Sequence, residues 1–168
     1  MRATAAIRWT VAALAAAMVV AAPGSAKTIN APVNAKVVKP LVLKHVQNLS
    51  LGTVVFDPGS WSGARLRLAP NGTLTCPAEL TCTGAARVAI YNVTGSNGTV
   101  RVNAPDVTLV NQSDPTKTLS MAVEGPGTVT LPNSGSKGVD FPLGGEIRLN
   151  STTASGTYVG TFNVTVDY

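Results

Sequence analysis

Residues 157–168 read TYVGTFNVTVDY, the longest alternating stretch in the chain. Tyr158, Phe162, Val164, Val166 and Tyr168 fall at even positions, so they share one face of an extended chain. Alternation with a period of two predicts a β-strand that buries one face. We expect this strand at the edge of a sheet, where it could accept a strand from another chain.

Shorter alternating runs recur along the rest of the sequence, separated by Gly, Pro and Asn. After residue 27, no window keeps apolar residues at helical spacing for three turns. Strands are expected at residues 40–46, 52–56, 64–69, 72–76, 86–93, 98–104, 106–110, 117–123, 127–131, 137–143, 145–150 and 156–168. Their spacing predicts an all-β sandwich, and Asn-Gly pairs at 71–72 and 97–98 predict two tight hairpins.

The first 26 residues have the features of a secretory signal peptide. Arg2 and Arg8 precede an apolar run too short to span a bilayer, and Gly24 and Ala26 give a small-x-small pattern, so cleavage is expected after Ala26. The protein is therefore expected to be exported to the periplasm, the cell surface or the medium, with no stable membrane span after cleavage.

The remaining sequence is long enough for one β-sandwich domain. We expect an N-terminal extension at residues 27–38 and a single domain at 39–168. Loss of Arg2 and Arg8 from 13 basic residues leaves 11 against 8 acidic ones, a formal charge of +3. This excess forms no basic run, so no nucleic-acid partner is expected.

The extension contains a second alternating segment, TINAPVNAKV at residues 28–37. Its apolar positions are Ile29, Ala31, Val33, Ala35 and Val37. Burying the three branched side chains yields about 1.5–3 kcal/mol each, whereas ordering each of ten residues costs about 1–2 kcal/mol. Continuous ladder hydrogen bonds are needed to offset that cost. The segment could pair with a neighbouring molecule, fold back on its own sheet, or remain a disordered tail.

Cys76 and Cys82 are the only cysteines in the sequence. In an exported protein, such a closely spaced pair predicts a disulfide that closes a small loop. A zinc site is the alternative, but two thiolates and the single histidine do not supply four ligands.

No catalytic, cofactor-binding or metal-binding set is recognised, so the protein is not expected to be an enzyme. His45 has the parity of Leu41 and Leu43, which predicts a partly buried structural histidine. Trp61 and Phe56 are expected in the core or at its rim rather than as a sugar-stacking platform. Four acids beside turn residues are expected to cap turns: Asp57, Asp106, Asp114 and Asp140.

Three segments carry a resemblance to a known family: residues 37–55, 86–105 and 141–168. They resemble the exported bacterial family catalogued as domain of unknown function 4402, and the block from GGEIRLN to the final Tyr168 is the strongest part. That family has no assigned enzymatic activity. The loop between Cys76 and Cys82 departs from its pattern.

More distantly, the C-terminal block is similar to chaperone–usher pilin subunits and to spore-coat-like secreted domains of archaic pili. Such pilins typically keep a Gly twelve residues before a near-terminal Tyr, as Gly156 and Tyr168 are here. The resemblance implies an immunoglobulin-like sandwich that lacks its last strand and receives the N-terminal extension of a neighbour. Ile29, Val33 and Val37 would then fill deep pockets, and Ala31 and Ala35 shallower ones.

We therefore expect a non-enzymatic, pilin-like structural subunit that assembles at the bacterial surface by strand exchange. Its expected partners are further copies or related subunits, a periplasmic chaperone and an outer-membrane usher. The alternative is a self-contained, monomeric secreted module that binds carbohydrate or matrix.

Overall fold

The computed structural model describes residues 31–132 and 137–168. The chain divides into two compact units, Met1–Ala35 and Lys36–Tyr168. In the first unit, residues 31–35 belong to no strand and their side chains are exposed. The predicted signal peptide lies outside the described residues. No helix in the described ranges has the length and apolar character needed to cross a membrane.

The second unit is all-β, and its described residues form thirteen strands. They are β1 (Val42–Gln47), β2 (Thr53–Phe56), β3 (Ala64–Leu68), β4 (Leu74–Thr75), β5 (Leu80–Thr83), β6 (Ala89–Thr94), β7 (Gly98–Asn103), β8 (Val107–Asn111), β9 (Thr118–Glu124), β10 (Thr128–Leu131), β11 (Val139–Leu149), β12 (Tyr158–Val159) and β13 (Thr165–Asp167).

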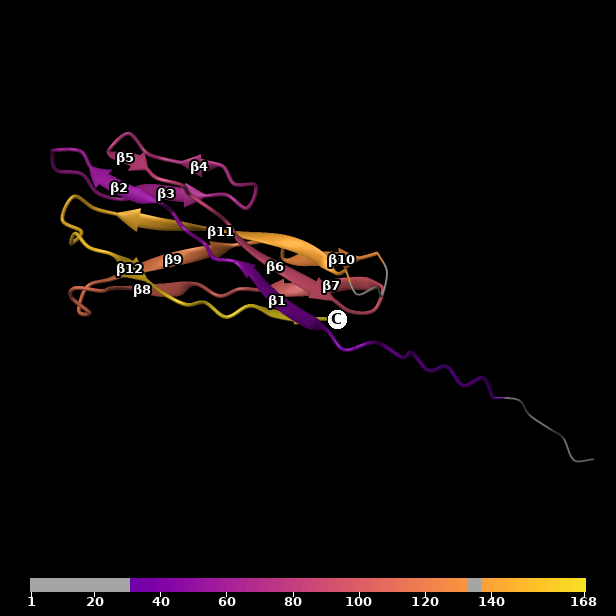
Figure 1. The fold of residues 1–168 in the computed structure, drawn as a ribbon. Coiled ribbons are helices and arrows are strands. Elements are labelled where there is room, and N and C mark those ends of the chain that lie inside the picture. The colour runs from indigo at the N-terminus through magenta and orange to yellow at the C-terminus, as the bar shows by residue number, and fades with distance from the viewer. Residues whose placement is uncertain (1–30, 133–136) are drawn as a thin grey trace, which may run out of the picture. The chain divides into compact units, whose positions relative to one another are not determined.

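These strands build an antiparallel β-sandwich (Figure 1). The larger sheet has the order β1-β6-β11-β9-β8-β12, with β3 paired to β11 and β4 paired to β3. The smaller sheet has the order β10-β7-β13, and β2 and β5 form a two-stranded ribbon. The predicted all-β sandwich is therefore confirmed.

Strand β11 holds the larger sheet together by changing partners along its length. Val139–Leu143 pairs with β6, and residues 145–149 pair with β3. Gly144 lies where β11 changes from β6 to β3 as its partner. There β3 and β11 approach so closely that a Cβ atom on Gly144 would overlap the Leu68 carbonyl oxygen. A glycine is therefore required at position 144 for β3 and β11 to pair.

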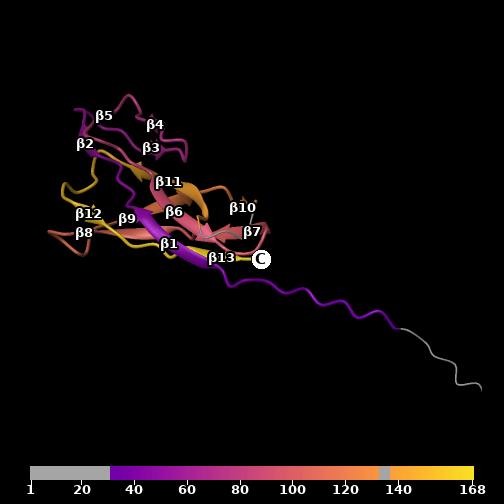
Figure 2. The same ribbon diagram turned by 45° about the vertical axis from the view of Figure 1, so that its right-hand side comes forward.

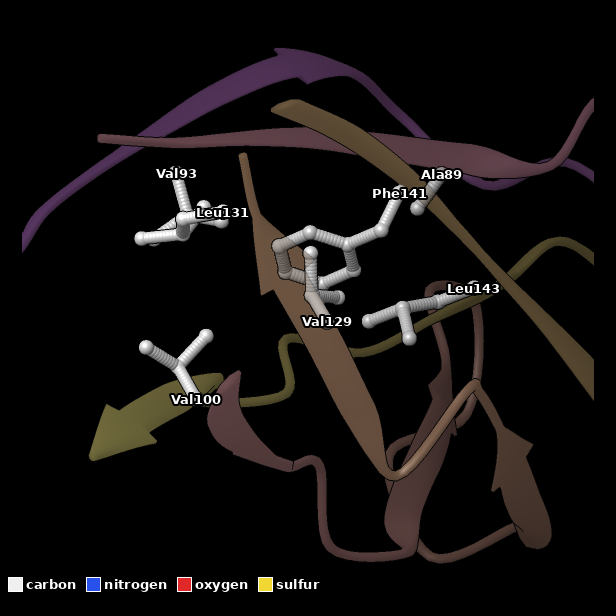
Figure 3. Packing of buried hydrophobic residues seen from close by; sticks show 7 residues of the cluster. All are labelled: Ala89, Val93, Val100, Val129, Leu131, Phe141 and Leu143. Carbon is white, nitrogen blue, oxygen red and sulfur yellow. The ribbon is translucent and has the colours of Figure 1, made fainter. Parts of the chain in front are cut away.

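The buried apolar side chains form two clusters. The first core cluster lies between the two sheets (Figure 3) and consists of Ala89, Val93, Val100, Val129, Leu131, Phe141 and Leu143. The second core cluster lies beneath β2 and β5 and consists of Ala64, Leu66, Leu80, Met121, Ile147 and Leu149. Alternating inward side chains supply both clusters, as expected for a sandwich.

Several predicted elements differ from the structure. The Asn-Gly pair at 71–72 does join the antiparallel strands β3 and β4. The hairpin predicted at 97–98 is wrong, because β6 and β7 belong to different sheets and this turn carries the chain between the layers. Strand β5 was not predicted, and the strands expected at 137–143 and 145–150 are one continuous strand.

The C-terminal stretch at residues 157–168, which we call the C-terminal ribbon, is also not one continuous strand. Its first part, β12, pairs with β8 in the larger sheet, whereas β13 pairs with β7 in the smaller sheet. The ribbon passes from one layer to the other through residues 160–164, which belong to no strand. Phe162, Val164 and Val166 nevertheless share an inward face and pack against the first core cluster, whereas Tyr168 is 47% exposed.

Gly156, which precedes this ribbon, has a φ of +143°. A Cβ atom at this position would lie 2.4 Å from the side-chain nitrogen of Asn111. Asn111 is only 1% exposed. Its amide donates to the Ser155 carbonyl at 2.9 Å, and its side-chain oxygen accepts from the Ser113 N–H at 2.9 Å. Packing against Asn111 therefore explains why the first residue of the Gly-to-Tyr interval, Gly156, is a glycine.

Truncating a fully buried side chain of the first core cluster should reduce stability strongly. Leu143 is 0% exposed, so Leu143→Ala is expected to lower the free energy of unfolding by about 2–5 kcal/mol. Val42 is 45% exposed, and Val42→Ala should cost about 1 kcal/mol or less. Urea unfolding of both variants tests this, and equal costs would contradict the assigned core.

Two glycine substitutions separate backbone strain from steric overlap. Gly59 also has a positive φ, +125°, but nothing lies within 4 Å of an added Cβ. Gly59→Ala should cost about 1–3 kcal/mol through strain alone. Gly156→Ala should cost at least about 1 kcal/mol more, because it displaces the buried Asn111 amide from its partners. Thermal unfolding compares the two, and a Gly156 variant as stable as the Gly59 variant would refute the packing role.

Candidate functional site

A groove of about 1190 Å³ lies beside β1 and the C-terminal ribbon. One wall consists of His45 and residues 48–56, and the other of residues 153–162. The floor is formed by Leu66, Ala89, Tyr91, Leu109, Leu119, Met121, Ile147 and Leu149.

The groove borders the second core cluster, whose six members are themselves buried. Leu66, Met121 and Ile147 of that cluster form part of its floor. Leu109 and Leu119 also face it, but they remain only partly buried. Apolar surface left in contact with water costs roughly 25 cal/mol per Å². An apolar occupant would therefore cover these two leucines.

Both walls present strand edges to the groove. Strand β1 pairs with β6 along one edge, and the described residues supply no ladder partner for its other edge. On the opposite side, β12 is the other terminal strand of the larger sheet, and residues 160–164 after it belong to no strand. Backbone N–H and C=O groups along open edges can form a new ladder with an added strand.

Beyond the groove, the segment before β1 and the end of the C-terminal ribbon meet (Figure 2). There the Tyr168 hydroxyl donates to the Lys39 carbonyl at 2.7 Å and accepts from the Ser96 N–H at 2.6 Å. The Lys39 N–H donates to the Ser96 hydroxyl oxygen at 2.5 Å. We call these three residues the clasp. In both ribbon views, β1 and the C-terminal ribbon separate from the clasp towards β12 (Figures 1 and 2).

Aromatic rings meet at the side of the groove. The Tyr91 ring stacks on Phe141 with centroids 5.9 Å apart, and it meets Phe162 at 6.5 Å. His45 contacts the Tyr91 ring edgewise at 5.3 Å. Burial raises the pKa of the Tyr91 hydroxyl above its ordinary value, so this group is protonated at neutral pH and can donate a hydrogen bond.

The predicted burial of His45 is wrong. Its side chain is exposed, although it lies beside Tyr91 as its parity with Leu41 and Leu43 requires. The reason is local: the ladder register between β1 and β6 shifts between His45 and Gln47, at the mouth of the groove. An inward-facing position there has no neighbour across the groove to cover it.

A disulfide joins Cys76 to Cys82, as predicted. Cys82 lies in β5 opposite Val54 of β2, and its side chain packs against the second core cluster. Because β2 forms part of the first groove wall, the disulfide stabilises the β2–β5 pair that contributes to this wall.

The predicted donor residues that the structure describes, from Ala31 onwards, have no partner strand in this single chain. Ile29 lies outside the described residues. Ala31, Val33, Ala35 and Val37 belong to no strand and are exposed; for Val33 and Val37 the exposed fractions are 91% and 92%. The strand predicted at 28–37 is therefore absent over residues 31–37 in this state.

The predicted acceptor residues divide between the groove and the part of the C-terminal ribbon that follows it. Tyr158 and Phe162 line the groove. Val164 and Val166 pack against the first core cluster, and Tyr168 belongs to the clasp. Neither the first wall nor the floor residues Leu109 and Leu119 were predicted from the sequence as part of a site. Their alternation predicts inward-facing positions, but not that the space above them is open.

The other side chains considered as candidates have structural contacts. Trp61 packs against Phe56 at 5.2 Å, and its indole N–H donates to the Asp57 carbonyl at 3.2 Å. Hydrogen bonds from Thr116 lower the pKa of Asp114, which closes the β8–β9 turn. The remaining three carboxylates also accept hydrogen bonds: Asp57, Asp106 and Asp140. Within residues 31–132 and 137–168, no three His, Cys, Asp or Glu side chains form a metal-binding group.

Comparison with known proteins identifies one family. Residues 41–168, which include both groove walls, match the family model described as Domain of unknown function (DUF4402). No curated protein and no solved structure gives a significant match. The matched region covers most of the sequence and almost the whole folded unit, so the chain belongs to the DUF4402 family.

Proposed function

We propose that this protein is a non-enzymatic, exported structural subunit that assembles at the bacterial cell surface by β-strand exchange. Its groove would receive residues 28–37 of a second copy. The observation that carries the proposal is the groove itself, which has an apolar floor and lies between two strand edges.

The extension has the side-chain pattern that this groove requires. An inserted strand would direct Ile29, Val33 and Val37 towards the apolar floor and keep its polar face towards solvent. Pro32 lies on the polar face and lacks an N–H, so the ladder must be interrupted or open to solvent there. Val33 and Val37 are exposed in the single chain and would gain burial on insertion.

The energetic balance also favours a preformed acceptor. A ten-residue strand pays about 1–2 kcal/mol per residue for ordering, which burial of three branched side chains does not offset. Ladder hydrogen bonds of about 0.5–1.5 kcal/mol each would be available on both walls. Because the groove belongs to a folded unit, the donor bears most of the ordering cost.

Export and assembly partners remain part of this proposal. The sequence of residues 1–26 supports export, and the resemblance to pilins supports a periplasmic chaperone and an outer-membrane usher. An unfilled apolar groove would invite aggregation, so a chaperone strand would have to occupy it before assembly. The secreted binding module is the competing hypothesis, but the packing of Trp61 against Phe56 leaves it without an assigned carbohydrate platform.

A peptide-binding experiment tests the proposal. The chain truncated to Lys36–Tyr168, the compact unit, should bind a synthetic peptide of residues 28–37. Val33→Asp in the peptide should weaken binding at least about 100-fold, because it places a charge on the apolar floor. Asn34→Asp is the matched control, since it adds the same charge on the polar face, and should change the affinity by about threefold or less. Isothermal titration calorimetry measures all three peptides.

The same pair of substitutions applies to the whole chain after removal of the leader. The unsubstituted protein and the Asn34→Asp variant should form concentration-dependent oligomers, whereas Val33→Asp should remain monomeric in light scattering. Strand exchange would be refuted if the truncated chain failed to bind the peptide and the full-length protein stayed monomeric at all concentrations. That result would favour the binding module.

A further inference from the structure

We propose that the clasp of Lys39, Ser96 and Tyr168, together with Pro40, directs the N-terminal extension to a second copy and prevents it from filling the groove of its own chain. This inference rests on the proposed function and adds the determinant of partner choice.

The clasp fixes the chain where the extension joins the folded unit. Both backbone polar groups of Lys39 are engaged, with its N–H on the Ser96 hydroxyl and its carbonyl on the Tyr168 hydroxyl. Space around these bonds is restricted, because a Cβ atom on the buried Gly95 would lie 2.7 Å from both Leu41 and the Tyr168 oxygen. Lys39 is therefore held beside the end of the C-terminal ribbon, three residues before β1 begins.

To enter its own groove beside β1, the extension would have to reverse direction at this point. Tight hairpin turns need positive φ at one or both central residues. Pro40 is fixed near a φ of −65°, and a residue before proline is restricted to extended conformations. The Lys39-Pro40 pair therefore opposes a tight reversal. A wider loop would require Lys39 to leave the position in which the clasp holds it.

A reversal placed earlier in the chain would use residues of the donor itself. Val37, the last apolar donor position, lies only two residues before Lys39. A turn over residues 34–38 would consume Ala35 and Val37 and leave about half of the donor for pairing. An extension that enters the groove of a second copy needs no reversal, so all of its apolar positions remain available for pairing.

The test uses the whole chain without its leader and the double variant Pro40→Gly/Tyr168→Phe. The phenylalanine keeps the ring but removes both hydroxyl bonds of the clasp, and the glycine permits a turn. The double variant should become monomeric, and its capture of the 28–37 peptide should fall at least tenfold because its own extension occupies the groove. Thr116→Val, which removes a hydroxyl bond in the β8–β9 turn, should oligomerise like the unsubstituted protein.

Truncation separates this inference from the proposed function. Lys36–Tyr168 carrying the double substitution should bind the peptide within about threefold of the unsubstituted truncated chain, which shows an intact groove. If that truncated variant fails to bind, the double variant Pro40→Gly/Ser96→Ala is used in its place, because the Ser96 substitution removes only the hydrogen bond from the Lys39 N–H. An intact-groove variant that oligomerises at the same concentrations as the unsubstituted protein overturns the role of the clasp and leaves strand exchange standing. Failure of the unsubstituted truncated chain to bind any peptide would instead reject the proposed function.

Discussion

Two leucines that line the groove beside the second core cluster, Leu109 and Leu119, remain only partly buried. The members of that cluster on β3, β9 and β11 are themselves buried, so the open space lies next to a completed core and not within it. The chain before β1 and the end of the C-terminal ribbon meet at the clasp, and β1 and the ribbon separate from there. Their separation leaves a groove with two strand edges, which is the geometry required for β-augmentation.

Much of the fold follows from local patterns in the sequence. Alternation in segments such as Ala64–Leu68 identifies a strand and its buried face, and the structure has exposed and buried residues in the same order. The assignment of strands to the two sheets does not follow so directly from the sequence. The Asn-Gly pair at 97–98 resembles a hairpin turn, yet it joins strands of different layers. Hairpin and interlayer turns share the same local chemistry, and long-range packing decides between them.

The groove illustrates the same limit at the level of the site. The alternation of the C-terminal ribbon correctly assigns Phe162 and Val164 to one face, but it does not show that the strand is interrupted at residues 160–164. That interruption arises because β12 and β13 have partners in different sheets. The exposure of His45 likewise depends on the missing neighbour across the groove rather than on its own residue type.

Under the proposed function an added strand would complete this sandwich, and hydrogen exchange at residues 160–164 tests whether it does. These residues lack a strand partner in the single chain and should exchange rapidly. With the 28–37 peptide bound, their amides should exchange at least tenfold more slowly, while those of β10 remain unchanged. A bound peptide that leaves exchange at 160–164 unaltered would contradict the account.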